Sequence, residues 1–311
     1  MTDAAPTVPP SPAPGRPPRA RKSLAQYWLR QERYLKAIVA AADLHPLDSL
    51  LEIGPGTGNL TQHLLPQVNA LIAVELDARA LGYLRRRWPA EPKLWLVEGD
   101  ILKLNLTEHL AGRPAWPPPR KVVANIPYNI TGPLLETLLG SLTHPQPWPW
   151  ERLVLLVQKE VAERLTAGPG NRTFGALTVR LQYLTHCELL QTVPARAFHP
   201  KPQVDSAIIR LRPRPFDPVA QQPRLLHTLL NLGFNQRRKM LRNTLESLVA
   251  RDTVVAALEA VGAHPEARPE ALGVAEWVNL SNWLATHLSS TASNPSESAP
   301  AGRGGSESLV K

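Results

Sequence analysis

The sequence predicts an α/β domain built on a largely parallel sheet, followed by a smaller domain made only of helices. Four short apolar runs, each ending in a polar residue, recur at nearly equal intervals over residues 49–128, which is typical of strands that alternate with helices. From Arg214 onward the pattern turns helical, and a cluster of prolines marks the change. With 311 residues the chain can form one large domain, expected over 21–213, and one small domain, expected over 214–288.

Both ends of the chain have the composition of disordered segments. Seven prolines lie between Pro6 and Pro18, without the apolar segment that directs secretion. The other end is rich in Ser, Gly, Ala and Pro. We therefore expect disordered tails over residues 1–20 and 289–311.

The charge balance favours a polyanionic partner. There are 35 Lys and Arg residues against 26 Asp and Glu, a net charge of +9, and such an excess attracts nucleic acid through long-range attraction and counterion release. Cys187 is the only cysteine, which excludes an intrachain disulfide and a Cys-based zinc site. The nine histidines show no metal-ligand spacing, and no apolar run reaches the ~18 residues of a membrane span. We therefore expect a cytoplasmic protein with no metal and no membrane partner.

The four apolar runs share one pattern: a strand-like segment, a turn with a polar residue, and then helix-like sequence. They read SLLEIGPGTGN (49–59), ALIAVELD (70–77), KLWLVEGD (93–100) and KVVANIPY (121–128). Their polar residues stand 23, 25 and 25 positions apart, an interval that suits one strand and one crossover helix. Strands this apolar are typical of a parallel sheet that is covered on both faces.

Later runs are expected to complete the sheet. The run RLVLLVQKE (152–160) predicts a fifth strand, and two runs near 188–213 predict an antiparallel pair. In an open sheet with right-handed crossovers, the carboxyl ends of the parallel strands form one edge, and ligands bind there. The polar residues of the four turns should therefore line one crevice; they are Glu52, Glu75, Asp100 and Asn125.

The turn after the first run has the spacing G-x-G-x-G in Gly54, Gly56 and Gly58. Its glycines would let the backbone approach a ligand closely, although on this motif alone a dinucleotide site and a purely structural turn remain alternatives. Glu75 ends the next strand, where a carboxylate can accept hydrogen bonds from both ribose hydroxyls of an adenosine ligand. Asp100, after the third strand, could accept from an adenine amino group. Together with the motif on the fourth strand, these two acids favour S-adenosylmethionine over a dinucleotide.

The fourth run ends in Asn125-Ile126-Pro127-Tyr128, which suits methyl transfer to the exocyclic amine of a base. The lone pair of such an amine is delocalised into the ring. Two acceptors on its N–H bonds, the Asn125 side-chain oxygen and the carbonyl of Ile126 or Pro127, would favour the nucleophilic form. Pro127 fixes the turn, and Tyr128 offers a flat face to an extruded base. The structural alternative is that Pro127 ends a strand and Tyr128 packs in the core.

These motifs resemble those of the adenine-N6 dimethyltransferases of small-subunit ribosomal RNA, the KsgA/RsmA group. The similarity covers residues 21–288 and includes LLEIGPGTGNLT, ANIPYNITGPLL, VPARAFHPKPQVDSAIIRL and FNQRRKMLRNTL. It implies a Rossmann-like class I S-adenosylmethionine methyltransferase domain with a small all-helical C-terminal domain. The implied reaction is dimethylation of N6 of two adjacent adenosines in the 3′-terminal hairpin loop of 16S rRNA, contributing to ribosome biogenesis. We expect a monomer that acts on the small ribosomal subunit.

The resemblance also implies roles for individual residues. The expected contacts of S-adenosylmethionine are Leu29, Gly54, Gly56, Glu75, Asp100 and Asn125. Asn125, Pro127 and Tyr128 are expected at the reacting amine, with Phe198 holding the base against Tyr128. The chain departs from the family at Tyr27, where an asparagine is the rule. We keep Tyr27 as an expected cofactor contact through its backbone, because its side chain cannot replace an amide.

A basic run lies in the helical domain. In FNQRRKMLRNTLESL (234–248), apolar residues stand at helical spacing, with Lys239 and Arg242 away from the apolar face and Arg237 and Arg238 at its flanks. A solvated surface is the ordinary explanation of such a run. Beside a base-modifying site, we expect these four side chains to bind RNA phosphates instead.

Three other functions share part of the pattern: an Erm-type methyltransferase of 23S rRNA, a noncatalytic RNA-binding factor of ribosome assembly, and a DNA adenine methyltransferase. The segments FNQRRKMLRNTL and HPKPQVDSA favour the small-subunit group over the Erm type. The intact run from Asn125 to Tyr128 argues against a noncatalytic factor. A DNA methyltransferase is disfavoured because the sequence shows no separate target-recognition region.

Overall fold

The computed structural model describes residues 15–21, 24, 26–113, 115–146 and 149–292. The chain divides into two compact units, Met1–Asp217 and Pro218–Lys311. The division lies shortly after the domain boundary expected at residue 213.

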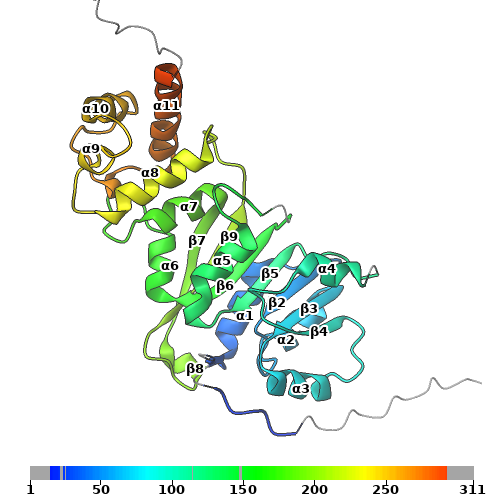
Figure 1. The fold of residues 1–311 in the computed structure, drawn as a ribbon. Coiled ribbons are helices and arrows are strands. Elements are labelled where there is room, and N and C mark those ends of the chain that lie inside the picture. Colours follow the sequence, from blue (N-terminus) through cyan, green and yellow to red (C-terminus); the bar gives the residue numbers. More distant parts are fainter. Residues whose placement is uncertain (1–14, 22–23, 25, 114, 147–148, 293–311) are drawn as a thin grey trace, which may run out of the picture. The chain divides into compact units, whose positions relative to one another are not determined.

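The first unit is built on a sheet of seven strands in the order β4-β3-β2-β5-β6-β9-β7 (Figure 1). Neighbouring strands from β4 to β6 are parallel, whereas β9 is antiparallel to both β6 and β7. The strands are β2 (Ser49–Ile53), β3 (Ala70–Glu75), β4 (Leu94–Glu98), β5 (Lys121–Asn125), β6 (Arg152–Gln158), β7 (Thr185–Val193) and β9 (Ser206–Pro213). The five predicted parallel strands and the antiparallel pair are confirmed.

Helices connect these strands. They are α1 (Glu32–Ala42), α2 (Thr61–Leu64), α3 (Ala78–Arg87), α4 (Leu106–Ala111), α5 (Thr131–Leu139), α6 (Lys159–Leu165) and α7 (Ala176–Leu184), with the short 3-10 helices η2 (Leu65–Gln67), η3 (Tyr128–Ile130) and η4 (Ala195–Ala197). Two further strands, β1 (Trp28–Leu29) and β8 (Phe198–His199), pair with each other in a separate small sheet.

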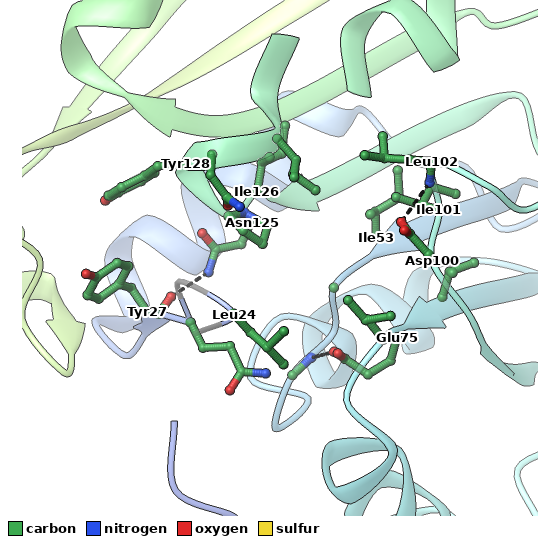
Figure 2. Close-up of a pocket in the computed structure, with 18 of the residues that line it drawn as sticks. Leu24, Tyr27, Ile53, Glu75, Asp100, Ile101, Leu102, Asn125, Ile126 and Tyr128 are labelled. Carbon is green, nitrogen blue, oxygen red and sulfur yellow. Dashed lines mark hydrogen bonds between the residues drawn. The ribbon is translucent and has the colours of Figure 1, made fainter. Parts of the chain in front are cut away.

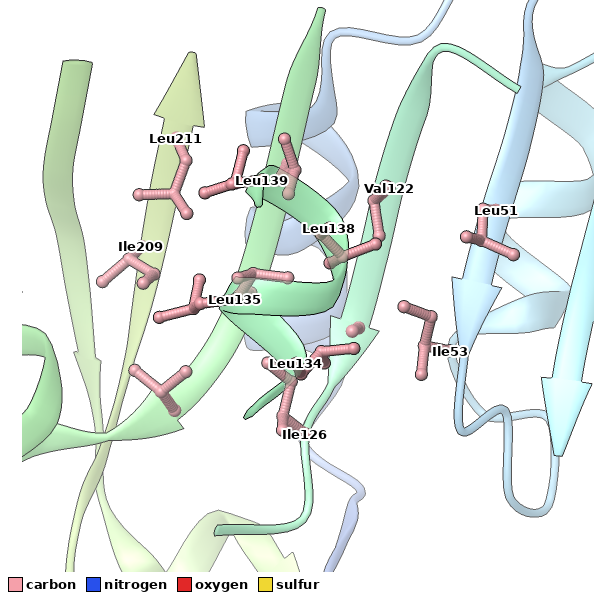
Figure 3. Close-up of a cluster of buried hydrophobic side chains, with 14 of the residues drawn as sticks. Leu51, Ile53, Val122, Ile126, Leu134, Leu135, Leu138, Leu139, Ile209 and Leu211 are labelled. Carbon is pink, nitrogen blue, oxygen red and sulfur yellow. The ribbon is translucent and has the colours of Figure 1, made fainter. Parts of the chain in front are cut away.

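Each face of the seven-stranded sheet has its own apolar cluster, because neighbouring residues of a strand point to opposite faces. Leu50 and Val123 belong to a cluster with residues of α1, whereas Leu51 and Val122 belong to a cluster with residues of α5. Figure 3 shows the second cluster, in which leucines of α5 lie over the sheet. Covering both faces explains why the strands are almost continuously apolar in sequence.

One acid lies inside this sheet. Glu52 of β2 is only 1% exposed, and its Oε2 atom accepts no hydrogen bond from the described residues. Burial, together with a smaller effect of the negative charge of Glu75, raises the pKa of Glu52 from 4.5 to about 8. The Glu52 side chain is therefore mostly protonated at neutral pH.

Every regular element in the described part of the second unit is a helix. These are α8 (Pro223–Asn235), α9 (Leu241–Thr244), α10 (Arg251–Ala260), η5 (Pro269–Ala271) and α11 (Val274–Ala292). Trp277 of α11 is fully buried, and its ring centroid lies 5.6 Å from that of Phe234 in α8. A Cβ on Gly233 would lie 2.8 Å from the Trp277 ring, so this packing requires a glycine inside α8. Within the described residues, no helix is both long and apolar enough to cross a membrane.

The structure corrects two expectations for this unit. The apolar spacing over 234–248 does not form one continuous helix, because α8 ends at Asn235 and Gln236 has the non-helical angles φ −126° and ψ 57°. Residues 289–292, expected to be disordered, belong to α11. The rest of the predicted C-terminal tail, and residues 1–14 of the N-terminal one, lie outside the described residues.

Leu51→Ala should lower the free energy of unfolding of the first unit by about 2–5 kcal/mol, because it removes a fully buried side chain and leaves a cavity in the cluster under α5. Leu47→Ala is the matched control. The Leu47 side chain is 78% exposed, so its loss should change the stability by less than about 0.5 kcal/mol. Urea denaturation followed by circular dichroism measures both variants. Equal losses would contradict the assignment of Leu51 to the core.

Glu52→Gln should alter how stability depends on pH. The wild-type carboxyl holds its proton more tightly in the folded state, so its contribution to stability is complete below pH 4.5 and is lost as the pH rises toward 8. The glutamine cannot ionise. The stability of the variant relative to wild type should therefore increase with pH in this window, by at most about 1.4 kcal/mol per pH unit.

Urea denaturation at several values between about pH 5 and pH 8 measures this difference. Glu98→Gln is the control for the removal of one exposed carboxylate. A difference between Glu52→Gln and wild type that stays constant over the window would show that Glu52 is not protonated in the folded state.

Candidate active site

A pocket opens at the edge of the sheet where β2, β3 and β5 end (Figure 2). Three of the four polar turn residues line it: Glu75 from β3, Asp100 beyond β4 and Asn125 from β5. The fourth, Glu52, lies in the wall of a smaller neighbouring pocket together with Leu29. The parallel order of the strands brings residues that are distant in sequence to one edge.

The backbone conformation and the protein packing of the turn after β2 both require glycine. Gly54, Gly56 and Gly58 have φ values of 69°, 59° and 77°, which residues with a side chain rarely adopt. A Cβ on Gly56 would lie 3.0 Å from the indole nitrogen of Trp28. At Gly54 the nearest atom to a Cβ would be the Asn125 carbonyl oxygen, 3.8 Å away. Gly54 is therefore the glycine of this turn that leaves space on the pocket side.

Glu75 is held rigidly at the end of β3. Its Oε2 accepts from the backbone N–H of Gly56 at 2.9 Å, and its Oε1 accepts from that of Asp77 at 2.8 Å. Burial raises the pKa of Glu75, and these two N–H donors oppose the shift. Each carboxylate oxygen still has a lone pair for a further donor, so Glu75 can bind ligand hydroxyls from this fixed position.

Asp100 lies on the next turn of the pocket wall. Its Oδ1 accepts from the backbone N–H of Leu102 at 3.0 Å, a bond that fixes the side chain within its own turn. Its other carboxylate oxygen accepts no hydrogen bond from the described residues, and Asp100 lines the pocket. Asp100 can therefore accept a hydrogen bond from a ligand.

The segment Gln26–Trp28 forms a further part of the pocket wall. Gln26 donates through Nε2 to Asp77 Oδ2 at 3.3 Å, and β1 at the end of the segment pairs with β8. Hydrogen bonds from Arg79, the largest of several causes, lower the pKa of Asp77. Gln26 and Trp28 also line the pocket, which the motifs of the sequence do not predict. The adjacent aromatic residues Tyr27 and Trp28 are the feature of the sequence that could have indicated this role.

The side chain of Asn125 has a defined orientation. Its Nδ2 donates to the backbone carbonyl of Tyr27 at 3.0 Å, shown as a dashed line in Figure 2. A carbonyl oxygen only accepts, so it can be paired with the amide nitrogen of Asn125 and not with its oxygen. The Oδ1 atom of Asn125 is thereby left as an acceptor at the pocket.

The turn after Asn125 offers two backbone carbonyls. The Pro127 carbonyl accepts from the N–H of Ile130 at 3.1 Å and so closes the turn that opens η3. The carbonyl of Ile126 is not used in this way by the described residues. Of the two acceptors that the sequence left open, the Ile126 carbonyl is therefore the less occupied one, and Pro127 acts by shaping the turn.

Tyr128 is anchored at the edge of the same pocket. Its hydroxyl lies 2.7 Å from Ser206 Oγ of β9, and Ser206 is fully buried. Burial raises the pKa of Tyr128, with the hydrogen bond to Ser206 opposing the shift. The ring is stacked on that of Tyr27, with centroids 5.5 Å apart and an interplanar angle of 24°. Tyr128 therefore presents a ring in the pocket and does not pack in the core, which was the structural alternative.

Phe198 and Leu29 lie apart from this pocket. They face each other in the β8–β1 pair, and both belong to the apolar cluster with α1, with exposed fractions of 5% and 3%. The structure does not bring Phe198 opposite Tyr128; the ring on Tyr128 is that of Tyr27. The carbonyl of Leu29 accepts from Asn59 Nδ2 at 3.0 Å. The roles expected for Phe198 and Leu29 remain predictions.

The basic residues of the second unit differ in their surroundings. Arg238 and Lys239 are exposed in the turn between α8 and α9 and line a hollow there. The guanidinium carbon of Arg237 lies 5.8 Å from the ring centroid of Phe234. Arg242 forms an ion pair of 3.0 Å with Glu266. Arg238 and Lys239 are therefore the two of the four predicted RNA contacts that are most accessible to a phosphate.

Most of the chain is similar in sequence to one known protein family. The family model described as "Ribosomal RNA adenine dimethylase" matches residues 18–286. A protein of Nostoc punctiforme named Ribosomal RNA small subunit methyltransferase A is 53% identical over 273 residues, which cover 86% of this chain and 96% of that protein. The protein of the same name in Synechococcus elongatus is 52% identical over 261 residues, which cover 84% of this chain and 94% of that one.

Solved structures agree with this fold. A dimethyladenosine transferase from Plasmodium falciparum matches with a TM-score of 0.70 and 26% identity, covering 83% of this chain and 97% of that chain. The 23S rRNA methyltransferase ErmE matches with a TM-score of 0.65 and 28% identity, covering 83% and 99%. The predicted methyltransferase fold is confirmed, as is the family indicated by the motifs. The chain belongs to the ribosomal RNA adenine dimethylase family.

Proposed function

We propose that this protein transfers methyl groups from S-adenosylmethionine to N6 of two adjacent adenosines in the 3′-terminal hairpin loop of 16S rRNA. The observation that carries the proposal is the orientation of Asn125. Its Nδ2 is bound to the Tyr27 carbonyl, which leaves its oxygen for an amine beside the Tyr128 ring. The names of relatives at 53% and 52% identity support the small subunit as the target.

The other side of the pocket fits the adenosine part of S-adenosylmethionine. When bound, this cofactor supplies a methyl group on a positively charged sulfur. Glu75 would accept hydrogen bonds from the ribose hydroxyls, for which each of its oxygens keeps a lone pair. Asp100 would accept from the adenine amino group, and the open surface of Gly54 would let the backbone come close.

On the acceptor side, Asn125 Oδ1 and the Ile126 carbonyl would each accept one N–H of the target amine. Two acceptors favour a pyramidal nitrogen, whose lone pair is free to attack. The nitrogen would gain a bond to the methyl carbon as the carbon–sulfur bond broke, and the nitrogen would then lose a proton to solvent. No base is needed before the attack, because the proton becomes acidic only afterwards; positioning supplies the rate.

The same acceptors permit a second transfer. A once-methylated amine keeps one N–H, and either Asn125 Oδ1 or the Ile126 carbonyl can bind it.

Phosphate contacts at Arg238 and Lys239 would hold the RNA without reading its sequence. We infer that the enzyme works as a monomer in the cytoplasm, where it would meet the small subunit.

The alternatives have weaker support. The Erm-type protein is 28% identical to this chain, well below the 53% of the small-subunit methyltransferase. A noncatalytic assembly factor would not need the fixed Asn125 amide in the wall of this pocket. A DNA adenine methyltransferase gains no support from the family match.

A labelled-methyl assay with unmodified small ribosomal subunits tests the proposed function. Label from S-adenosylmethionine should enter the RNA, and mapping of the modified nucleotides should find N6-dimethyladenosine at two adjacent positions near the 3′ end. Large subunits and duplex DNA serve as parallel substrates. Label entering only the large subunit would support the Erm type, and label in none of the three would support the noncatalytic factor.

Asn125→Ala should lower the turnover number about 10²- to 10³-fold, because it removes an acceptor that acts on the developing charge of the amine. The affinity for the small subunit should change far less, since the phosphate contacts remain. Asn69→Ala is the control, because Asn69 is exposed and remote from the pocket lining. Single-turnover kinetics and filter binding give the two quantities. Equal losses of turnover and RNA affinity would contradict the role of Asn125.

A further inference from the structure

The rings of Tyr27 and Tyr128 meet in the pocket although 100 residues separate them in sequence. Their centroids are 5.5 Å apart at an interplanar angle of 24°, the geometry of a directly stacked pair. Figure 2 shows both rings on the side of the pocket where Asn125 lies. A purine between two rings would need them about 7 Å apart, twice the contact distance of carbon atoms. This face of Tyr128 therefore cannot take a base while Tyr27 lies on it.

The two tyrosines are held very differently. Tyr128 is fixed at both ends, by its place in the turn after β5 and by the 2.7 Å contact of its hydroxyl with the buried Ser206. The hydroxyl of Tyr27 makes no hydrogen bond to the described residues. Its ring packs on Tyr128 and against the apolar cluster with α1, and no hydrogen bond fixes its position, so it can turn about its side-chain bonds.

The backbone of Tyr27 does not need to move with the ring. Its carbonyl accepts the Asn125 amide, and the neighbouring Trp28 pairs with His199 in the β1–β8 pair. A rotation of the ring would leave both contacts in place. The orientation of Asn125 is thus independent of where the Tyr27 ring lies.

We propose that the Tyr27 ring occupies the stacking position of the target adenine on Tyr128 and that the entering base displaces it. This inference rests on the proposed function, since it takes Tyr128 as the surface on which the target base stacks. Tyr27 is then a specificity-determining residue: every base must compete with a tyrosine ring for Tyr128. The asparagine that the family resemblance leads one to expect at this position has no ring and could not compete in this way.

The affinity for unmodified small ribosomal subunits tests the proposal, measured by filter binding for wild type, Tyr27→Ala and Tyr27→Phe. Tyr27→Ala should bind about two- to tenfold more tightly, the range that corresponds to the loss of one aromatic pair. Tyr27→Phe keeps the ring and loses only a hydroxyl that forms no hydrogen bond with the described residues. Its affinity should therefore stay near that of wild type. Weaker or unchanged binding by Tyr27→Ala would overturn the proposal.

A double-mutant cycle separates competition at Tyr128 from a structural effect of the substitution. In a Tyr128→Ala background, Tyr27→Ala should no longer tighten binding, because the contested surface is gone. The same gain in both backgrounds would overturn the proposal. The wild-type methyl-transfer assay reports separately on the proposed function. If wild type transfers methyl groups and the Tyr27 variants bind as wild type does, only the displacement is wrong.

Discussion

The hydrogen bond from Asn125 Nδ2 to the Tyr27 carbonyl determines how Asn125, Tyr27 and Tyr128 are arranged in the pocket. It joins the end of β5 to a segment from the start of the chain. Because a carbonyl can only accept, the bond fixes which end of the Asn125 amide remains for a ligand. It also brings the Tyr27 ring to Tyr128. One contact thus sets both which atom of Asn125 faces the pocket as an acceptor and which ring lies on Tyr128.

On the side of the pocket that holds Glu75, two buried acids differ in the hydrogen bonds that they receive. Glu75 receives two backbone N–H bonds, whereas Glu52 Oε2 receives none from the described residues. Two neighbouring buried carboxylates repel each other, so protonation is favoured on the acid that receives fewer hydrogen bonds. That acid is Glu52, whose pKa is about 8. A neutral Glu52 removes the repulsion that a second buried charge would exert on Glu75.

Most of the fold could be predicted from the sequence, because the parallel strands repeat at a regular interval and each ends in a polar residue. The positions of Glu75, Asp100 and Asn125 at one sheet edge follow from that topology. The stack of Tyr27 on Tyr128 could not be predicted, since it depends on how a remote segment packs. The turn that separates Asn235 from Leu241 was missed for a related reason: the apolar spacing continues across it although the backbone does not.

The proposed displacement of the Tyr27 ring by a base also bears on which interaction selects the target. A base–aromatic stack contributes about 1–3 kcal/mol and a tyrosine pair about 0.5–1.5 kcal/mol, so the exchange itself favours the base only slightly. Every base has an aromatic face, and stacking therefore discriminates poorly. A base with a carbonyl in place of the amine would leave Asn125 Oδ1 and the Ile126 carbonyl unpaired, at a cost of about 1–3 kcal/mol for each. The two acceptors thus outweigh the stack in choosing an amine, while Tyr27 offsets about half of the affinity that stacking alone would give to a wrong base.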